Sequence, residues 1–261
     1  MGILSQGFDT LRVRLDDDIC FIQLYRPNAG NAINDRMVAE LDTVLAECEP
    51  AVKVVVLEGL PEVFCAGADF EEIRERVDGL AQDEALGPGP LYDVWHRLAH
   101  GPYISIAHVR GRANAGGVGF VAACDVVLSD DKAVFSLSEL LFGLMPACVL
   151  PFLIRRVGQA KANYLTLMTQ PITAAQAEAW GLVDGCEANS ENLLRKKLLR
   201  LRLLGKAGIV RYKRYVRDLD ATLAAAREPA LAANREVFSD PDNLARVARY
   251  VRTGKLPWEA D

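Results

Sequence analysis

The chain has 261 residues, of which 51% are hydrophobic and 25% are charged, and its formal net charge at pH 7 is −5. A chain of this length and composition suits one large domain, or a core domain with a small appendage, and it excludes a wholly disordered protein. The acidic balance argues against nucleic acid as a partner. No apolar run reaches the roughly 20 residues that a membrane-spanning helix needs.

The cysteines indicate a reduced, metal-free interior. They are scattered through mostly apolar runs without a Cys-x-x-Cys pair, at Cys20, Cys48, Cys65, Cys124, Cys148 and Cys186. Such spacing is typical of core thiols rather than of a disulfide framework or a zinc site. The first thirteen residues lack the basic start and apolar stretch of a signal peptide. We therefore expect a cytoplasmic protein that does not enter a membrane.

The N-terminal segment alternates between strand and helix signals. Two short β-type runs, Val13–Leu15 and Cys20–Leu24, are separated by three aspartates and predict a hairpin. Asn34 is expected to cap a helix over Asp35–Cys48, whose apolar residues recur on one face. The continuous β-branched run Val52–Leu57 predicts a strand that is buried on both faces.

A similar unit recurs along the middle of the chain. The segment Gln82–Pro90 is expected to form a mobile loop before a helix over Leu91–Leu98. An apolar strand over Ile104–Val109 is followed by a glycine-rich turn, a helix and another strand over Asp125–Leu128. This strand–turn–helix unit, recurring at roughly forty to fifty residues, predicts stacked ββα turns around a common core.

The C-terminal part of the chain is expected to be entirely helical. Strand signals vanish there, and Ser239 or Asp240 caps a helix that has proline at its first position. We therefore predict a core over residues 1–192 and a helical region over residues 193–261. Oligomer contacts are the usual purpose of such an appendage.

The span Arg195–Arg217 carries ten Lys and Arg residues and no acid. This run predicts a surface that attracts anions, either phosphate or an acidic carrier protein, with Arg211, Lys213 and Arg214 as the candidate contacts. A solvated helix face explains the same run, and RNA binding is a third interpretation.

Two glycine-containing turns follow predicted strands, Phe64–Asp69 and Gly111–Gly119. Their small residues let a ligand approach the backbone, and a helix N-terminus presents unpaired N–H groups. Asn114 is a plausible N-cap of the second helix, while Gly116 leaves its amide uncovered. Each turn alone is explained by tight packing between a strand and a helix. Together they can supply one N–H each to a single oxygen, which is an oxyanion hole.

These motifs resemble one family. The stretches FCAGADF, IAHVRGRANAGG and FSLSELLFGLMP occur in the order and spacing of the crotonase (enoyl-CoA hydratase/isomerase) superfamily, and RPNAGNAIN and AAQAEAWGLVDGCE are similar to its other signatures. The resemblance covers about residues 10–190. It implies an α/β crotonase fold, a stacked ββα spiral with a C-terminal helical oligomerisation region, assembled as a trimer or hexamer. It also implies that the amides of Ala68 and Gly116 polarise a thioester carbonyl.

The resemblance further implies a pair of catalytic glutamates, of which only one is present. The first position is occupied by Gly119 and the second by Glu139. With one acid, hydration of an unactivated enoyl thioester is disfavoured, whereas a syn elimination remains available if Glu139 serves both departing groups. The alternative for Glu139 is a helix-capping acid in an exposed loop. We expect Gly119 to leave open space opposite Glu139.

Several side chains are candidate helpers in substrate binding. They are Asp69, Asn114, and Tyr92 with His96, which are four residues apart and share a helix face. Arg112 is a candidate partner for a substrate carboxylate. Helix capping by the first two and half-buried packing by the aromatic pair are the alternatives.

Beyond the family motifs, the whole chain is similar to the enoyl-CoA hydratase-like dehydratases of polyketide β-branching cassettes, most clearly in VVVLEGLPEVFCAGADF, FSLSELLFGLMPACVLPFLIRR and RYVRTGKLPWE. This likeness implies dehydration of 3-hydroxy-3-methylglutaryl on an acyl carrier protein to 3-methylglutaconyl. No cofactor is implied beyond the phosphopantetheine arm of the carrier, or CoA. The alternatives are the decarboxylase of the same cassette, a CoA-thioester hydratase or isomerase, and a non-catalytic scaffold or RNA-binding member.

Overall fold

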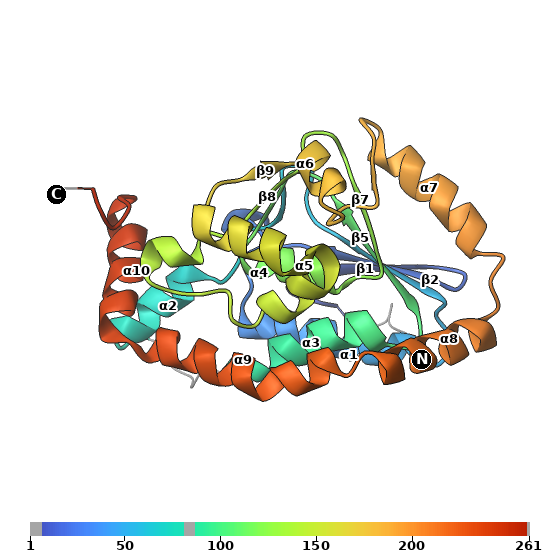
Figure 1. Ribbon diagram of the computed structural model, residues 1–261, viewed down its shortest axis with the longest axis horizontal. Coiled ribbons are helices and arrows are strands. Elements are labelled where there is room, and N and C mark those ends of the chain that lie inside the picture. The colour runs from blue at the N-terminus through green and yellow to red at the C-terminus, as the bar shows by residue number, and fades with distance from the viewer. Residues whose placement is uncertain (1–6, 81–86, 260–261) are drawn as a thin grey trace.

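Two β-sheets form the centre of the fold, and successive segments of the chain contribute one strand to each (Figure 1). The computed structural model describes residues 7–80 and 87–259. One sheet has the order β1-β2-β3-β5-β7-β10 and the other the order β4-β6-β8-β9. Because β3–β4, β5–β6 and β7–β8 each step from the first sheet to the second, the predicted ββα spiral is confirmed. The strands are β1 Leu11–Asp16, β2 Ile19–Leu24, β3 Val54–Glu58, β4 Val63–Cys65, β5 Ile104–Val109, β6 Arg112–Asn114, β7 Val126–Ser129, β8 Val134–Ser136, β9 Ile172–Thr173 and β10 Gly185–Cys186.

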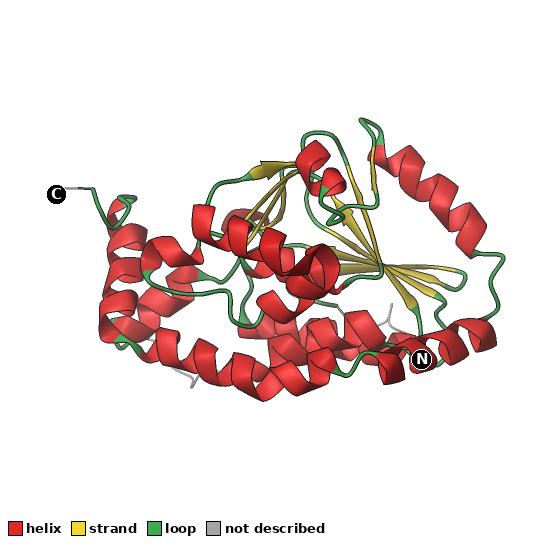
Figure 2. Cartoon of the chain, in the orientation of Figure 1, coloured by secondary structure: helices red, strands yellow, loops and turns green. Residues whose placement is uncertain are grey.

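Helices surround the two sheets (Figure 2). They are α1 Asp35–Cys48, α2 Phe70–Val77, α3 Gly89–His100, α4 Gly116–Ala123, α5 Leu150–Met168, α6 Ala174–Ala179, α7 Ser190–Leu201, α8 Lys206–Leu219, α9 Thr222–Ser239 and α10 Pro241–Thr253, with the 3-10 helices η2 Pro27–Ala29 and η3 Glu139–Phe142. Among the described segments, none is a helix with the length and apolarity needed to cross a bilayer.

The N-terminal predictions are confirmed. Strands β1 and β2 pair as an antiparallel hairpin, with Leu11 opposite Leu24. Asn34 caps α1, because its Oδ1 accepts a hydrogen bond of 3.0 Å from the amide of Met37. Strand β3 lies between β2 and β5, and its first four residues are buried, which explains their unbroken apolar run.

The predicted loop before α3 is partly wrong. Residues 82–86 of the expected loop Gln82–Pro90 lie outside the described residues, but Gly89 and Pro90 belong to the first turn of α3. Proline is tolerated there because the first-turn amides have no intrahelical partner. The helix therefore begins two residues before the predicted Leu91.

From Ser190 onward the described chain is helical, as expected. His108 links Ser190, at the start of α7, to Glu58 of the core. Its Nε2 lies 2.9 Å from Ser190 Oγ, and its Nδ1 lies 2.8 Å from Glu58 Oε1. Helix α9 runs beneath α3, and its Leu223 and Leu231 join the main hydrophobic core (Figure 1). Helix α10 lies beside α2. A domain division at residue 192 stays a prediction.

Lys213 anchors α8 to the core, which corrects its predicted role in binding phosphate. Its ammonium group donates to Asp125 Oδ2 at 2.6 Å and to the carbonyl of Ala99 at 2.7 Å, and its side chain is only 5% exposed. The ammonium is therefore already paired inside the protein. The neighbouring Arg211 and Arg214 are exposed on the same helix.

We expect Lys213→Met to lower the free energy of unfolding by about 3 kcal/mol, because it leaves the carboxylate of Asp125 without its buried partner. Urea denaturation measures the change. The matched variant Arg214→Met removes an exposed charge on the same helix and should shift stability by no more than about 0.5 kcal/mol. Equal effects of the two substitutions would contradict a structural role for Lys213.

Candidate active site

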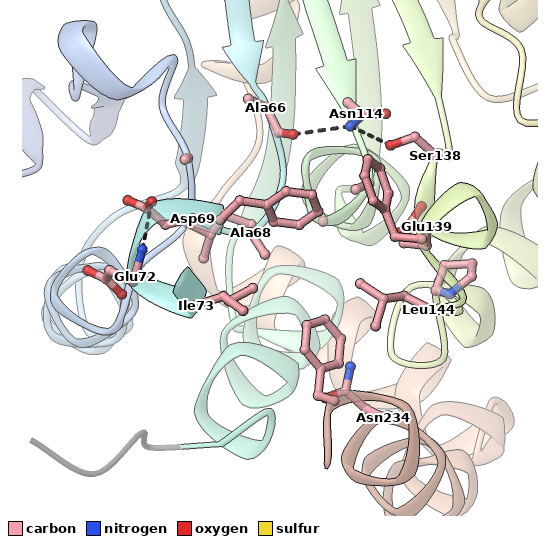
Figure 3. A pocket seen from close by; sticks show the side chains of 18 of the residues that line it. Ala66, Ala68, Asp69, Glu72, Ile73, Asn114, Ser138, Glu139, Leu144 and Asn234 are labelled. Atoms are coloured by element: carbon pink, nitrogen blue, oxygen red, sulfur yellow. Dashed lines mark hydrogen bonds between the residues drawn. The ribbon is translucent and has the colours of Figure 1, made fainter. Parts of the chain in front are cut away.

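A cavity of about 1610 Å³ lies between the two glycine turns, α2, the segment after η3, and helices α9 and α10 (Figure 3). Its walls include the backbone of both turns, the side chain of Glu139, and apolar side chains from α2, η3 and α10. Helix α10 is held over this region by an aromatic cluster in which Phe142 packs at 5.2 Å from both Phe70 and Tyr250. The cavity is therefore bounded by elements that are far apart in the sequence.

The first turn exposes the amide of Ala68. Ile33 donates to the carbonyl of Gly67 at 2.7 Å and accepts from the amide of Asp69 at 3.0 Å, forming an isolated parallel bridge. These two bonds use the groups on either side of Ala68. In a parallel bridge, the residue flanked by the two bonded groups directs its own N–H away from the partner strand. Ala68 is that residue, and it lines the cavity.

The second turn exposes the amide of Gly116. Ala115 has φ 51° and ψ −121°, a conformation that an L-residue adopts only under constraint. Gly116 is the first residue of α4, so its amide has no partner within the helix. A Cβ on Gly67 would lie 2.8 Å from Ala115 Cβ, so the two turns are in contact. Ala68 and Gly116 each follow this contact by one residue, and both line the cavity.

Arg26 and Asn31 brace the first turn, and sequence reasoning assigned neither of them a role. Asn31 is fully buried; its Oδ1 accepts from the amide of Arg26 at 2.7 Å, and its Nδ2 donates to the carbonyl of Phe64 at 3.1 Å. The sequence signal that could have identified these two residues is the family-like stretch RPNAGNAIN, which contains Arg26 and Asn31 and precedes the first turn.

Asp69 is a helix cap, which was the alternative to its predicted role in substrate binding. Its Oδ1 accepts from the amides of Glu71 at 3.1 Å and Glu72 at 3.4 Å. Its Oδ2 pairs with the guanidinium of Arg26 at 2.8 Å. Both oxygens are thus occupied, although Asp69 does line the cavity.

Asn114 braces the site and does not cap α4 as predicted, because it is the last residue of β6 and Ala115 follows it before the helix. Its Nδ2 donates to the carbonyl of Ala66 at 3.2 Å and to Ser138 Oγ at 3.0 Å (Figure 3). Its Oδ1 accepts from Ser136 Oγ at 2.7 Å. The amide therefore ties the two turns to the segment that carries Glu139.

Glu139 combines burial with a place on the cavity wall. It is the first residue of η3, and its Oε2 is buried without a hydrogen-bond partner among the described residues. Burial raises the pKa of its carboxyl to about 7. Glu139 follows Ser136, the residue hydrogen-bonded to Asn114, by three positions. A carboxyl with such a pKa can accept and return a proton near neutral pH.

Gly119 does not leave the open space that we expected. A Cβ at this position would lie 2.5 Å from Cζ2 of Trp95, so the indole fills the gap. Trp95 is 1% exposed and packs edge-on against Phe120 and Phe152. The position where the family carries its other glutamate is thus occupied by an aromatic ring.

The prediction that Tyr92 and His96 face the cavity is wrong. Tyr92 is fully buried, and its hydroxyl donates to the carbonyl of Leu223 at 2.7 Å. His96 Nε2 lies 3.1 Å from Nδ1 of His100. Helix α3 turns this face toward α9 and α8, and it contributes only its first turn to the cavity.

The arginines that were predicted to bind anionic groups lie in two different parts of the molecule. Arg112 is exposed and lines the cavity at the start of β6. Arg211 and Arg214 do not line it, and Figure 1 shows α7 and α8 at the end of the molecule away from α2 and α10. The basic stretch is therefore not next to the cavity within one chain.

The profile of the enoyl-CoA hydratase/isomerase family matches residues 14–261. The dehydratase PksH of bacillaene synthase from Bacillus subtilis is 53% identical over 253 residues, covering 97% of each chain. A probable enoyl-CoA hydratase from Rhizobium meliloti is 30% identical and covers 97% of this chain and 99% of its own.

Solved structures agree with these relatives. The crystal structure of the pksH protein from Bacillus subtilis, described as an enoyl-CoA hydratase of polyketide biosynthesis, aligns with a TM-score of 0.93 over 96% of this chain and 100% of that one. An enoyl-CoA hydratase from Mycobacterium avium subsp. paratuberculosis aligns with a TM-score of 0.83 at 25% identity, over 98% of this chain and 100% of that one.

We expect Gly119→Ala to lower the free energy of unfolding by about 1–3 kcal/mol, because the added methyl group overpacks the site that the Trp95 indole occupies. Gly208→Ala is the matched control, since it is also helical but has open space around its Cβ. That variant should gain about 0.5–1 kcal/mol from helix propensity. Denaturant titration with tryptophan fluorescence measures both, and a stabilised Gly119→Ala protein would show that the indole does not fill the gap.

Proposed function

Because the chain belongs to the enoyl-CoA hydratase/isomerase family, we propose that it is a dehydratase that eliminates water from a 3-hydroxyacyl thioester. The proposed substrate is 3-hydroxy-3-methylglutaryl carried on an acyl carrier protein, and the product is 3-methylglutaconyl, formed during β-branching in polyketide biosynthesis. The observation that carries the proposal is the carboxyl of Glu139, which is buried without a hydrogen-bond partner among the described residues, in a cavity that Ala68 and Gly116 also line.

The first step is removal of the α-proton. The thioester oxygen accepts hydrogen bonds from the amides of Ala68 and Gly116, which makes the α-carbon more acidic by stabilising the enolate. Removing one such donor typically costs about 3–4 kcal/mol of transition-state stabilisation. The carboxylate of Glu139 takes the α-proton, so negative charge moves from the glutamate to the thioester oxygen.

The second step expels the hydroxyl group. The enolate re-forms its carbonyl, the electron pair makes the α,β double bond, and the β-carbon–oxygen bond breaks. Glu139, now protonated, delivers its proton to the departing oxygen on the same face, so that water leaves and the carboxylate is restored. A tertiary hydroxyl lowers the demand for a second acid, because the β-carbon tolerates developing positive charge.

The missing second acid and the filled gap at Gly119 support dehydration of a tertiary alcohol over hydration of an unactivated enoyl thioester. A hydratase of this family holds its water between two carboxyls, whereas here the Trp95 indole lies against the second position. Elimination is also redox-neutral, so we propose that no cofactor acts beyond the phosphopantetheine arm. The cavity exceeds the roughly 300–1000 Å³ of ordinary small-molecule sites, which leaves room for an arm as well as an acyl group.

We propose that several chains associate as a trimer or hexamer. Large apolar side chains remain exposed on and between α7 and α8, including Leu203 at 73%, Tyr212 at 65% and Leu219 at 68%. Several exposed large apolar side chains in one region are typical of an interface. An acidic carrier protein is the proposed partner, and Arg211 and Arg214 can serve it only where association brings their helix near the cavity of a neighbouring chain.

The test is to incubate the protein with hydroxymethylglutaryl carrier protein and to follow the intact mass of the carrier. Loss of one water supports the proposal. No reaction with this carrier, together with loss of carbon dioxide from the 3-methylglutaconyl carrier, would favour the decarboxylase. No reaction with either carrier but turnover of an enoyl-CoA would favour a hydratase or isomerase. Retention of RNA at physiological salt without turnover would favour the RNA-binding interpretation.

We expect Glu139→Gln to lower the dehydration rate about 10³-fold while the fold and the oligomeric state are kept, because the amide cannot accept the α-proton. Single-turnover mass spectrometry measures the rate, and circular dichroism checks the fold. The control Glu236→Gln alters another acid of the cavity wall and should leave most of the rate. Retention of most of the rate in Glu139→Gln would exclude Glu139 as the proton carrier.

The pKa of about 7 predicts the pH dependence of dehydration. Burial disfavours the charged carboxyl, so Glu139 is mainly protonated below pH 7 and cannot accept the α-proton there. The logarithm of kcat/KM should rise with a slope of about one up to pH 7 and then level off. The substrate for this measurement is a pantetheine thioester, which lacks the phosphate of the phosphopantetheine arm, so that no phosphate of the substrate titrates in the same pH range. A midpoint near 4.5 would show that the carboxyl is solvated in solution.

A further inference from the structure

We propose that Arg235, on α9, binds a carboxylate at the far end of the acyl group and thereby selects dicarboxylic acyl thioesters. This inference rests on the proposed function, since it specifies which acyl chains the same site accepts. It differs from the sequence-based expectation, which gave that role to Arg112.

The charges on the cavity wall leave two arginines available. Among the described residues, the cations that line the cavity are Arg26, Arg76, Arg112 and Arg235. Arg26 is paired with Asp69 at 2.8 Å, and Arg76 lies 3.3 Å from a carboxylate oxygen of Asp35. Arg112 and Arg235 form no ion pair with any residue that the structure describes.

The strand register places Arg112 on the side away from the acyl group. Strands β6 and β8 are parallel, with Arg112 opposite Val134 and Asn114 opposite Ser136. The chain continues from the second pair toward Gly116 on one strand and toward Glu139 on the other. Arg112 therefore lies about two strand positions, roughly 7 Å, upstream of Asn114. An acyl group that extends from the oxyanion pair past Glu139 leads away from it.

Arg235 lies on the helix that closes the acyl side. Helix α9 contacts the segment after η3, because Cys148 Sγ lies 3.7 Å from the carbonyl of Ala230. Asn234 follows one turn later on the same face and projects into the cavity below Glu139 in Figure 3. The guanidinium of Arg235 is also close enough to affect Cys148, which lines the same wall. Burial raises the pKa of the Cys148 thiol, and the positive charge of Arg235 is the largest effect opposing that rise.

The chemistry of this wall suits a carboxylate. Its other residues on or near α9 include the apolar Leu144, Pro146 and Ala147 and the acid Glu236, which forms no ion pair with Arg235 among the described residues. A guanidinium offers a planar pair of donors that matches both oxygens of a carboxylate. A second anion on the substrate would also be repelled by the Glu139 carboxylate, and pairing with Arg235 offsets that repulsion.

The test compares two unreactive pantetheine thioesters, 3-methylglutaryl and 3-methylvaleryl, which differ in the terminal carboxylate. Isothermal titration calorimetry measures their dissociation constants with the wild-type protein, Arg235→Gln, Arg235→Lys and Arg112→Gln. We expect the wild type to bind the glutaryl thioester about tenfold more tightly, as one charge-assisted pair provides. Arg235→Gln should lose this preference, Arg235→Lys should keep part of it, and Arg112→Gln should keep all of it.

Equal binding of the two thioesters by the wild type, or loss of the preference in Arg112→Gln rather than in Arg235→Gln, overturns the inference. Unreactive thioesters separate it from the proposed function. A protein that prefers the glutaryl thioester but never releases water from the 3-hydroxy substrate would keep Arg235 as the carboxylate site and refute the dehydratase. Dehydration without any preference between the thioesters would refute only the role of Arg235.

Discussion

The close contact between the two glycine turns is the constraint on which the site depends. Gly67 has no side chain where Ala115 approaches it, and a methyl group there would lie only 2.8 Å from Ala115 Cβ. The contact holds Ala115 in a strained conformation, which a non-glycine residue keeps only when its surroundings impose it. The hydrogen bonds of Asn114 secure both turns to the strand that leads to Glu139. In the proposed reaction, amides held in this way need no rearrangement when charge develops on the thioester oxygen.

The surroundings of Glu139 set the proton affinity of its carboxyl. Its carboxyl loses hydration inside the cavity wall, which raises its pKa toward neutrality, and Trp95 fills the position from which a second acid would act. A buried carboxyl that changes charge near pH 7 can take a proton in one step and return it in the next. The same burial leaves Oε2 without a partner, a cost that a structural acid would have no reason to keep.

The C-terminal helices complete the cavity from the other side. Asn243 on α10 donates to the carbonyls of Gly143 and Val237 at 3.1 Å, which links α10 to the turn after η3 and to α9. Helix α9 brings Arg235 to the wall of the cavity. The spiral core thus carries Ala68, Gly116 and Glu139, while the helical tail supplies another part of the cavity wall.

The sequence by itself determined the local elements of the fold. The periodicity of apolar residues, helix capping and the placement of glycines predicted the hairpin, α1 and the ββα repeats, because these features depend on neighbouring residues. The family-like motifs singled out Ala68, Gly116 and Glu139, which line one cavity, and their catalytic roles stay a prediction. Tertiary structure decided which polar side chains are free. Long-range partners use the ammonium of Lys213 and the hydroxyl of Tyr92, and the indole of Trp95 closes the space at Gly119. Such contacts join residues that are distant along the chain, so no local pattern records them.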